Sequence, residues 1–469
     1  MPNLGLRVAS LAMLLAAGCA TLEPPLPTAD PSLPARWSPT RSAEDVADAG
    51  LPARAAADIG WRDFFQDPKL QTLIARALAD NRDLRVAILN IEKVRAQYRI
   101  QRSEQLPWVG GNVTLERIGG DTPARSSYSA GVGVNDFELD LFGRIRNLTD
   151  AALQQYLGQE AARRAVQLAL IGEIATAYLT LATDRELLRF SQATLKTYQD
   201  SYALTEKRFS LGAVSGLELE QIRTQVESAR ADAARYQGRI ALDANALDLL
   251  VGAPVEPTLL PAGLKDQGIS LVAPPGGLPS ETLLRRPDIQ AAEHRLRAAN
   301  ANIGAARAAY FPSVSLTGSL GSASAELTDL FGGGTLLWRF APQVNLPIFQ
   351  GERLRAAVEG ATADRDIALA QYEKAIQTGF REAADALALA DALVRQYQAQ
   401  SALADAATRA ERLSRARYQA GRDSYLLLLD AQRTLYAAQQ NLLATYYAEQ
   451  ANRIALYKVL GGGWKERSR

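Results

Sequence analysis

The sequence predicts an α+β protein built from two copies of one unit, in which each copy supplies two β-strands and two long helices. Matching residues recur 205 to 209 positions apart along the 469-residue chain, which indicates an internal duplication. In each copy the spacing of apolar residues changes from three or four positions to two, and a long stretch without proline follows. The duplication, the change of period and the proline-free stretches together predict this fold class.

The composition describes a folded chain with a large core and balanced charge. Hydrophobic residues make up 47% of the chain and charged residues 22%, which excludes an intrinsically disordered protein. Lys and Arg number 52 against 51 Asp and Glu, so the net charge of +1 gives no basic surplus for binding nucleic acid. A single cysteine excludes a disulfide within the chain.

The first residues have the pattern of an export signal that ends at this cysteine. The longest apolar run, Val8 to Ala17, stops just before Cys19, and we expect no apolar run in the sequence to be long enough to cross a membrane as a helix. The pattern resembles a bacterial lipobox, which implies that residues 1–18 are a signal peptide and that Cys19 is acylated. Because Ala20 is not the aspartate that retains such lipoproteins, the implied destination is the outer membrane. The alternative is a chance thiol beside an ordinary cleavage site.

A proline-rich segment follows the signal. Seven prolines between residues 22 and 52 disfavour a helix and favour an extended conformation. We therefore interpret residues 19–60 as a lipid-anchored strap.

The repeat sets the domain boundaries. Asp83-Leu84 matches Asp288-Ile289 at a spacing of 205, and the spacing grows to 209 where Leu250-Val251-Gly252 matches Val459-Leu460-Gly461. Short loop insertions would leave such a drift. The predicted domains are the two copies, the linker between them and a tail: residues 61–252, 281–461, 253–280 and 462–469.

The first copy should begin with a helix. Asp67-Pro68 is a typical helix start, and this helix is expected to run to about Gln105.

Strands are predicted at residues 107–142 and 312–349. Apolar residues alternate with polar ones in both regions, except that the apolar parity switches at Phe137, which a β-bulge or the exit from a membrane would explain. Strands with one apolar and one polar face are typical of a transmembrane barrel, and a soluble sandwich hairpin is the alternative. Because four strands cannot close a barrel, a barrel would need several chains.

Very long helices should follow the strands. Proline is absent from Pro123 to Pro254 and again after Pro347. A helix over residues 145–209 would extend about 95 Å, further than a membrane is thick, so we expect it in an aqueous space. Each long helix should reverse at a tip, 208–217 or 417–426, that contains a glycine. Alanine is common in the helix seams, so the helices can pack closely into a wall, and a closed wall would form a cylinder.

Signatures of catalysis and metal binding are weak. The only histidine, His294, falls on a predicted helix without a cluster of metal ligands around it. Gly332-Gly333-Gly334 lacks the lysine of a phosphate-binding loop and is expected to be a hairpin loop. We therefore expect no catalytic residue, no bound metal and no cofactor.

These motifs together resemble the outer membrane factors of tripartite efflux systems, which are TolC-like proteins, and especially their lipoprotein branch. The most specific motifs are the second tip and three shorter segments: residues 417–432, Arg285-Arg286-Pro287-Asp288, Tyr310-Phe311-Pro312 and residues 456–464. The resemblance implies a homotrimer with a twelve-stranded barrel in the outer membrane and a coiled-coil tunnel through the periplasm. It also implies a periplasmic adaptor protein and an inner-membrane pump of the RND type as partners.

The implied function is a passive exit duct for drugs or other small molecules. The tips would dock the adaptor through the residues at their turns: Gly212, Val214, Ser215, Gly421, Asp423 and Ser424. Three residues match the family's constriction positions, and their spacing places them on one helical face, so that around a trimer they would form rings that close the tunnel: Leu426, Asp430 and Arg433. The alternative is a surface ion pair of Asp430 with Arg433. The first copy has no such pair, since its equivalents are Leu217, Gln221 and Thr224.

Other functions compete with this interpretation. The same architecture would serve as the outer membrane component of a type I protein secretion system. A lipid-anchored periplasmic coiled-coil scaffold would explain the helices but neither the strand pairs nor the lipobox. A monomeric porin would need more strands, and an enzyme would need a cluster of titratable groups.

Overall fold

The computed structural model describes residues 22–32, 59–121, 123–264, 280–463 and 465–467. The predicted signal peptide and Cys19 lie outside these residues. The chain divides into two compact units, and each takes segments from both sequence copies. We name them the sheet unit, formed by residues up to Pro31 with Leu89–Ala161 and Gln290–Ala375, and the hairpin unit, formed by Ser32–Ile88, Ala162–Ile289 and Ile376–Arg469.

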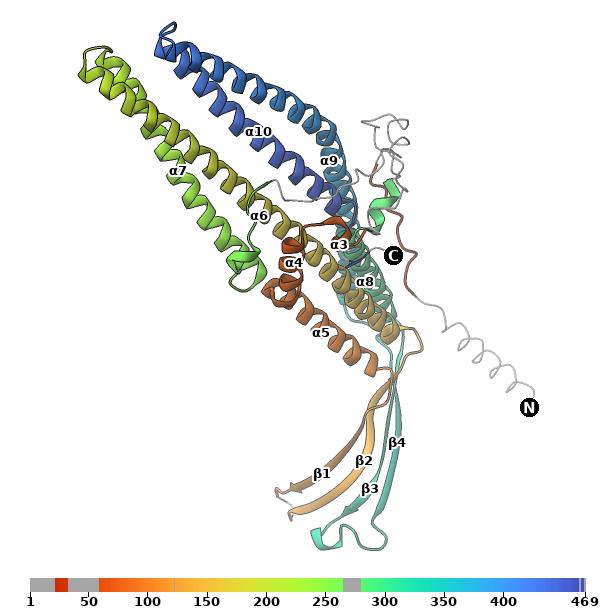
Figure 1. Cartoon of the computed structure of the whole chain (residues 1–469). Coiled ribbons are helices and arrows are strands. Elements are labelled where there is room, and N and C mark those ends of the chain that lie inside the picture. Colours follow the sequence, from red (N-terminus) through yellow and green to blue (C-terminus); the bar gives the residue numbers. More distant parts are fainter. Residues whose placement is uncertain (1–21, 33–58, 122, 265–279, 464, 468–469) are drawn as a thin grey trace. The chain divides into compact units, whose positions relative to one another are not determined.

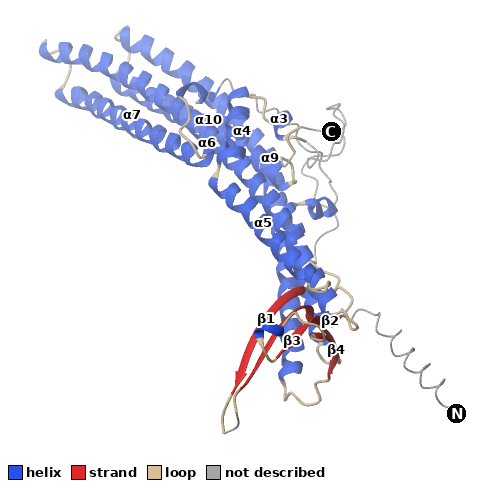
Figure 2. Cartoon of the chain, turned by 90° about the horizontal axis from the view of Figure 1, so that it is seen from below, coloured by secondary structure: helices blue, strands red, loops and turns tan. Residues whose placement is uncertain are grey.

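The sheet unit contains all four strands of the described chain in one antiparallel sheet (Figure 2). The strands are β1 (Val109–Ile118), β2 (Arg125–Leu139), β3 (Ser313–Ser324) and β4 (Leu336–Asn345), in the order β1-β2-β3-β4. A short 3-10 turn (Leu327–Asp329) and the predicted glycine loop join β3 to β4. Proline is tolerated at position 342 because β4 is an edge strand of this sheet.

A β-bulge explains the parity switch in the first copy. The register between β2 and β3 shifts between Val134 and Phe137. Within this interval Asp136 has a φ of 51°, in the left-handed region that few residues other than glycine adopt. Of the two explanations that the sequence left open, the bulge is the one found.

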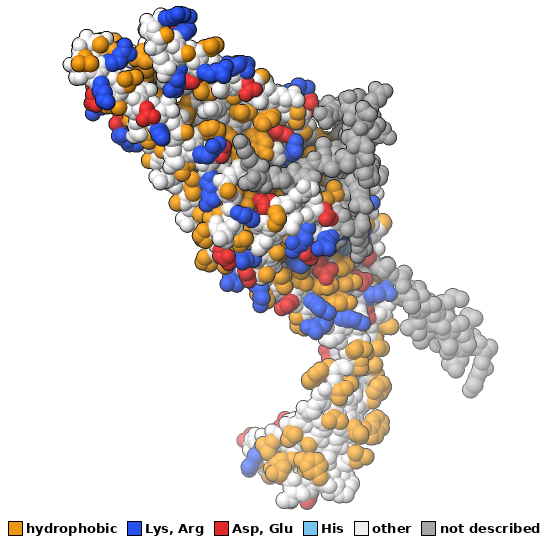
Figure 3. All heavy atoms as spheres, in the orientation of Figure 1, with side chains coloured by type: hydrophobic (Ala, Val, Ile, Leu, Met, Phe, Trp, Pro, Cys, Tyr) orange, Lys and Arg blue, Asp and Glu red, His pale blue; other side chains and the backbone are white. Residues whose placement is uncertain are grey.

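The sheet exposes apolar side chains along its strands, as the space-filling view shows (Figure 3). Val113 is 82% exposed and Trp338 is 72% exposed, although valine and tryptophan side chains are usually mostly buried in soluble proteins. A sheet in water would need a second layer over such a face. The alternating pattern therefore belongs to a surface that meets lipid or another chain.

Four helices have residues in both units. These helices are α5 (Arg82–Ser103), α6 (Arg144–Ser210), α8 (Pro287–Ala308) and α9 (Arg353–Gln419). Both α6 and α9 have 67 residues, which corresponds to about 100 Å each at ~1.5 Å per residue. The equal lengths are what an internal duplication produces.

In the hairpin unit α6 and α9 each reverse into a returning helix, α7 (Gly216–Val251) and α10 (Tyr425–Val459) (Figure 1). Five residues of α6 spaced by three and four positions form a packing seam and are at most 6% exposed: Leu168, Ile171, Ala175, Tyr178 and Ala182. The remaining elements are α3 (Trp61–Phe64), α4 (Pro68–Asp80) and the 3-10 turns η2 (Pro257–Leu259) and η4 (Ser280–Arg285).

The prediction of one helix from Asp67 to Gln105 was wrong. The helix is interrupted at Asn81, whose ψ of 131° is extended, so α4 ends at Asp80 and α5 begins at Arg82. The Asn81 side chain accepts a hydrogen bond from the Leu84 amide and donates one to the Leu250 carbonyl. The side chain of Asn81 thus caps α5 and also bonds α7, and these two hydrogen bonds offset the helical hydrogen bonds that are lost at the break.

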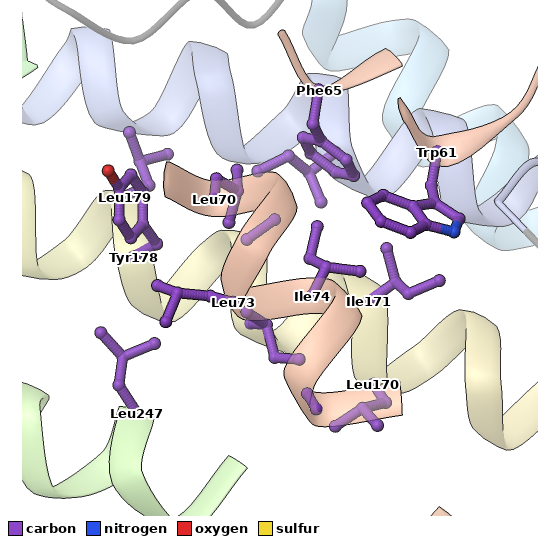
Figure 4. Packing of buried hydrophobic residues seen from close by; sticks show 14 of the residues in the cluster. Trp61, Phe65, Leu70, Leu73, Ile74, Leu170, Ile171, Tyr178, Leu179 and Leu247 are labelled. Carbon is purple, nitrogen blue, oxygen red and sulfur yellow. The ribbon is translucent and has the colours of Figure 1, made fainter. Parts of the chain in front are cut away.

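The core of the hairpin unit lies where α3 and α4 pack on α6 and α7 (Figure 4). Trp61, Leu73 and Ile74 from the short helices meet Ile171 of α6, and all four are at most 2% exposed. Each such side chain contributes about 1.5–3 kcal/mol of hydrophobic stabilisation. The Asp67 carboxylate caps α4 and accepts a hydrogen bond from the Tyr178 hydroxyl, which joins the helix start to α6.

The expectation about membrane-spanning helices needs a correction. Among the described residues, α6 contains an 18-residue stretch that is long and apolar enough to cross a membrane. Half of that stretch is buried inside the protein. The composition reflects a helix packed in the core.

Candidate functional site: the two helical tips

Both tips turn with the same backbone motif. Gly212 and Gly421 have φ values of 72° and 70°, in the left-handed region that glycine adopts at little cost. In each tip the glycine amide and the amide after it donate to carbonyls three and five residues earlier, which is the Schellman motif. A Cβ atom at either glycine would meet nothing within 4 Å. The requirement for glycine is therefore conformational, and the space beside it is open.

The first tip is capped by Ser215, whose hydroxyl accepts a hydrogen bond from the Glu218 amide at 3.2 Å. Leu211 is 82% exposed and Leu217 is 70% exposed on either side of the turn. Val214 lies between these two leucines in the sequence. The first tip thus presents apolar side chains on both sides of a turn that Ser215 caps.

The second tip is closed by an ion pair. Arg417 donates to both carboxylate oxygens of Asp423, at 2.6 and 2.8 Å. This pairing lowers the pKa of Asp423 and raises the pKa of Arg417. Ser424 begins α10 without a side-chain capping bond, in contrast to Ser215. The predicted tip residues thus share a backbone but differ in side-chain bonding.

The two tips contact each other through Tyr418. Arg208 of the first hairpin donates to the Tyr418 hydroxyl at 2.9 Å and lies over its ring. That hydroxyl in turn donates to Glu218 at 3.3 Å. Burial raises the pKa of Tyr418. Tyr418 also packs edge-on against Tyr425, in a cluster with Ile222 and two leucines of α10.

The predicted constriction residues share one exposed face of α10. Leu426 is 58% exposed, and Asp430 and Arg433 are exposed as well. The opposite face of the same turns is buried: Tyr425, Leu428, Leu429 and Gln432. The structure therefore brings the three residues together on a surface, as their spacing predicts.

Arg433 bonds to the first hairpin and not to Asp430. Its Nε donates to Gln225 of α7 at 3.1 Å. Among the described residues no ion pair joins Asp430 to Arg433, so the alternative of a surface pair is not found in this chain. Two further bonds continue the seam between α7 and α10: Tyr436 to Asp232 at 3.0 Å and Gln440 to Tyr236 at 3.4 Å.

The comparisons with known proteins agree on one family. The family model described as outer membrane efflux protein matches residues 73–253 and 278–462, which is most of the chain. The chain belongs to the outer membrane efflux protein family. The two matched segments begin 205 residues apart, at the spacing of the sequence repeat.

Two curated members of this efflux family come from Pseudomonas putida. The toluene efflux pump outer membrane protein TtgC is 46% identical over 465 residues, covering 96% of this chain and 94% of that protein. The antibiotic efflux pump outer membrane protein ArpC is 47% identical over 454 residues, covering 95% and 92%.

A solved structure of similar fold is the open state of the MtrE outer membrane channel of Neisseria gonorrhoeae. Its TM-score is 0.89 at 39% identity, and the match covers 96% of this chain and all of that one. The family and the fold class predicted from the sequence are therefore confirmed.

Sequence reasoning missed the residues that join the tips. Arg208 and Arg417 are equivalent in the repeat, yet Arg208 bonds the other hairpin and Arg417 bonds its own turn. A signal was present: the partner Asp423 stands where the first copy has Val214. Comparing the two copies residue by residue would have identified this difference.

His294 lies on α8 in the sheet unit. Its Nδ1 is 2.7 Å from Oε1 of Gln154 on α6. The described residues contain no group of three or more His, Cys, Asp or Glu side chains that could hold a metal ion.

Proposed function

We propose that this outer membrane efflux protein acts as a homotrimeric channel, the passive exit duct of a tripartite system that exports small molecules. The observation that carries the proposal is the four-stranded sheet with two unpaired edges and an exposed apolar face, joined in one chain to helices of about 100 Å. Three copies would supply twelve strands, enough for a closed barrel. The helices would line a tunnel in the periplasm. The names of the relatives favour apolar solvents and antibiotics as the exported class.

The internal repeat predicts how neighbouring chains pair. Val109 lies opposite Val134, and the equivalent Val314 lies opposite Val344, so Val134 and Val344 are equivalent. Between the two copies, Val134 lies opposite Gly318, the equivalent of Val113. If β4 of one chain pairs with β1 of the next in the same way, Val344 lies opposite Val113 of that chain.

Cysteine cross-linking tests the trimer. With Val113→Cys and Val344→Cys in one chain, oxidation in outer membranes should give covalent dimers and trimers, because opposed residues bring their Cβ atoms to about 4.5–5.5 Å. Moving the first cysteine to Thr114 places it on the other face of the strand and should abolish the cross-link. Monomers from both pairs would rule out this barrel.

We further propose that the tips dock a periplasmic adaptor, which links the channel to an inner-membrane pump of the RND type. The open space at Gly212 and Gly421 and the exposed leucines beside them support this. Gly421→Trp should abolish export and cross-linking to the adaptor while trimers remain. Gly238→Trp is the matched control, because Gly238 is also surrounded by open space but lies in the middle of α7. Normal export by Gly421→Trp would place docking elsewhere.

The closed state would be held by Leu426, Asp430 and Arg433. Their shared exposed face supports rings around the trimer axis, and opening would need the Arg433 to Gln225 bond to break. Asp430→Ala with Arg433→Ala should raise single-channel conductance and make cells leaky to large antibiotics. The first-copy equivalents, Gln221→Ala with Thr224→Ala, should leave both unchanged. Unchanged conductance in the first variant would place the closure at another level of the tunnel.

The lipid anchor completes the proposal. The lipobox pattern supports cleavage before Cys19, acylation of that residue and attachment to outer membrane lipid. Intact mass spectrometry of the purified protein should show a chain that begins at Cys19 with acyl groups attached. A chain with an unmodified thiol would contradict it.

A further inference from the structure

The first described residues after Cys19 are bonded along α8 in the sheet unit. Arg307 donates to the Leu22 carbonyl at 3.3 Å. The side-chain nitrogen of Asn300 donates to a carboxylate oxygen of Glu23 and to the Pro24 carbonyl, both at 2.8 Å. Asn300 is only 1% exposed, so its side chain makes these two bonds from a buried position. We name Leu22–Asp30 the docked segment.

A glycine makes room for this segment. Gly304 lies between Asn300 and Arg307 on one face of the helix, four residues after the first and three before the second. A Cβ atom at position 304 would lie 3.0 Å from the Glu23 amide nitrogen and 2.5 Å from the Asn147 side chain. A side chain at position 304 would therefore displace Asn147 first, and a large one would also displace the segment at Glu23. We name Asn300, Gly304 and Arg307 the α8 groove.

The first sequence copy has no such groove. At the repeat spacing of 205, the three positions are Arg95, Arg99 and Arg102 on α5. An arginine in place of Gly304 would fill the space that the docked segment occupies. The groove is consequently a feature of the second copy alone and not a by-product of the repeated fold.

We propose that the α8 groove is a binding site for the chain's own N-terminal segment and sets the position of the lipid anchor relative to the sheet. This proposal rests on the acylation of Cys19 proposed above. Leu22 follows Cys19 by three residues, which span at most about 11 Å. Arg307 lies six residues before Ser313, where β3 begins. The groove thus holds the acylated end beside the start of the strands.

The composition of the segment suits such docking. Pro24, Pro25 and Pro27 restrict the free chain, so less conformational entropy is lost on binding. A proline has no N–H group that would need a hydrogen-bond acceptor, and the carbonyl of Pro24 accepts a bond from Asn300. At the far end the Asp30 amide donates to Glu373 of α9 at 3.1 Å, so the segment is held at both ends.

Hydrogen exchange of the intact acylated protein in detergent tests the docking. The amides of the docked segment, and above all that of Asp30, which donates to Glu373, should exchange about tenfold more slowly than in a synthetic peptide of the same sequence. Gly304→Leu should remove this protection, whereas Arg99→Leu, the same new side chain at the equivalent position of α5, should preserve it. Asn300→Ala serves as a second variant that leaves the backbone of α8 undisturbed, and it should also release the segment while the α8 amides stay protected.

A photo-activatable benzoylphenylalanine at position 22 tests the position of the anchor. In the parent chain it should cross-link within the chain to the end of α8, and with Gly304→Leu this product should be lost. The proposed binding site would be wrong if the segment in the parent chain exchanged as fast as the free peptide. It would also be wrong if Arg99→Leu lost as much protection as Gly304→Leu. If mass spectrometry finds no acyl group while the segment stays protected, the binding site stands and its role in placing an anchor falls.

Discussion

The two sequence copies close the same helix junction in the hairpin unit with different side chains. In the first copy Asn81 donates to the Leu250 carbonyl at 2.8 Å. In the second the equivalent residue is Arg286, and it donates at 3.2 Å to the carbonyl of Val459, the equivalent of Leu250. Each bond ties the start of α5 or α8 to the end of a returning helix, so both copies make this contact with different side chains.

The arginine adds bonds that the asparagine cannot make. Arg286 also reaches Asp288 at 2.8 and 3.0 Å and Glu382 of α9 at 2.9 Å, while only 8% exposed. Space for it comes from Gly379, whose added Cβ would lie 3.4 Å from the guanidinium. The first copy has Leu170 there, packed in the core. The two copies therefore keep the same backbone contact, and the residue that makes it differs together with the residue beside it: Asn81 with Leu170, and Arg286 with Gly379.

The largest expected effect comes from breaking the second junction. Arg286→Ala should lower the free energy of unfolding by about 3–5 kcal/mol, because it leaves partly buried carboxylates and a buried carbonyl without their partner. Asn81→Ala should cost less, about 1–3 kcal/mol, since the lost bonds involve no charge. Guanidinium unfolding followed by circular dichroism measures both. Equal costs would show that the charges add nothing, and Arg285→Ala at the exposed neighbouring position is the control.

Giving the second junction the side chains of the first tests whether Arg286 and Gly379 depend on each other. Gly379→Leu alone should cost about 1–3 kcal/mol, because the new side chain overlaps the guanidinium of Arg286. Adding Arg286→Asn should recover part of this loss, which a double-mutant cycle would record as a coupling of about 1 kcal/mol or more. Strictly additive costs would mean that glycine and arginine do not depend on each other.

The tips are expected to behave alike in stability. Gly212→Ala and Gly421→Ala should each cost about 1–2 kcal/mol, because both residues hold a positive φ and neither meets a neighbour that would add a steric penalty. Asparagine tolerates this conformation better and should cost less at both positions. The same unfolding experiment applies. A clear difference between the two alanine variants would reveal that one tip is strained by its surroundings.

The first hairpin contains a pair of carboxyl groups, Asp184 and Asp243, that the second hairpin lacks, and this pair makes the stability of the first hairpin depend on pH. Burial, and then the charge of Asp184, raise the pKa of Asp243 to about 6. The second copy has Leu393 and Asn452 at these positions. Because the raised pKa favours the protonated form in the folded state, this contribution is present below the ordinary pKa near 4 and is lost as pH rises through about 6.

Asp243→Asn should remove this dependence. Between pH 5 and pH 8 the parent chain should lose stability relative to the variant, by no more than about 1 kcal/mol because solvent screens a partly exposed group. Unfolding of both proteins at the two pH values measures the difference. A parent chain that gains stability relative to the variant between pH 5 and pH 8 would contradict the sign.

The smallest effect separates the two equivalent arginines of the tips. Arg208→Ala should weaken the contact between the hairpins by about 0.5–1 kcal/mol, because it removes a charged donor from the half-buried Tyr418 hydroxyl. Arg417→Ala should leave that contact unchanged, since its bonds stay within an exposed turn. Hydrogen exchange at the tip ends of α7 and α10 reports the opening. Faster exchange in the Arg417 variant would place its ion pair in the contact.

Much of the fold could be predicted from spacing alone. The strands, the long helices and the two glycine turns follow from local patterns, since a period of two, a run without proline and a positive φ each depend on neighbouring residues. The break at Asn81 was not predicted, although asparagine is a good N-cap and its side chain accepts a hydrogen bond from the Leu84 amide. This local preference alone does not select a break over a continuous helix, and the bond to the distant Leu250 carbonyl adds to it.

The candidate site divides in the same way. Which residues occupy the tips, and that Leu426, Asp430 and Arg433 share a face, are determined by helical geometry. That Arg433 bonds Gln225 and not Asp430, and that Arg208 reaches Tyr418, depends on packing between helices over 200 residues apart in the chain.

The duplication, the strands, the long helices and the family resemblance follow from the order and spacing of residues, whereas the break at Asn81 does not. The different contacts that the two copies make are visible only in the folded chain. The same position of the repeat is arginine on α5 and glycine on α8, and only the folded chain shows the docked segment that the glycine admits. The physical reason is that a groove, a junction or a salt bridge depends on which distant groups share its space.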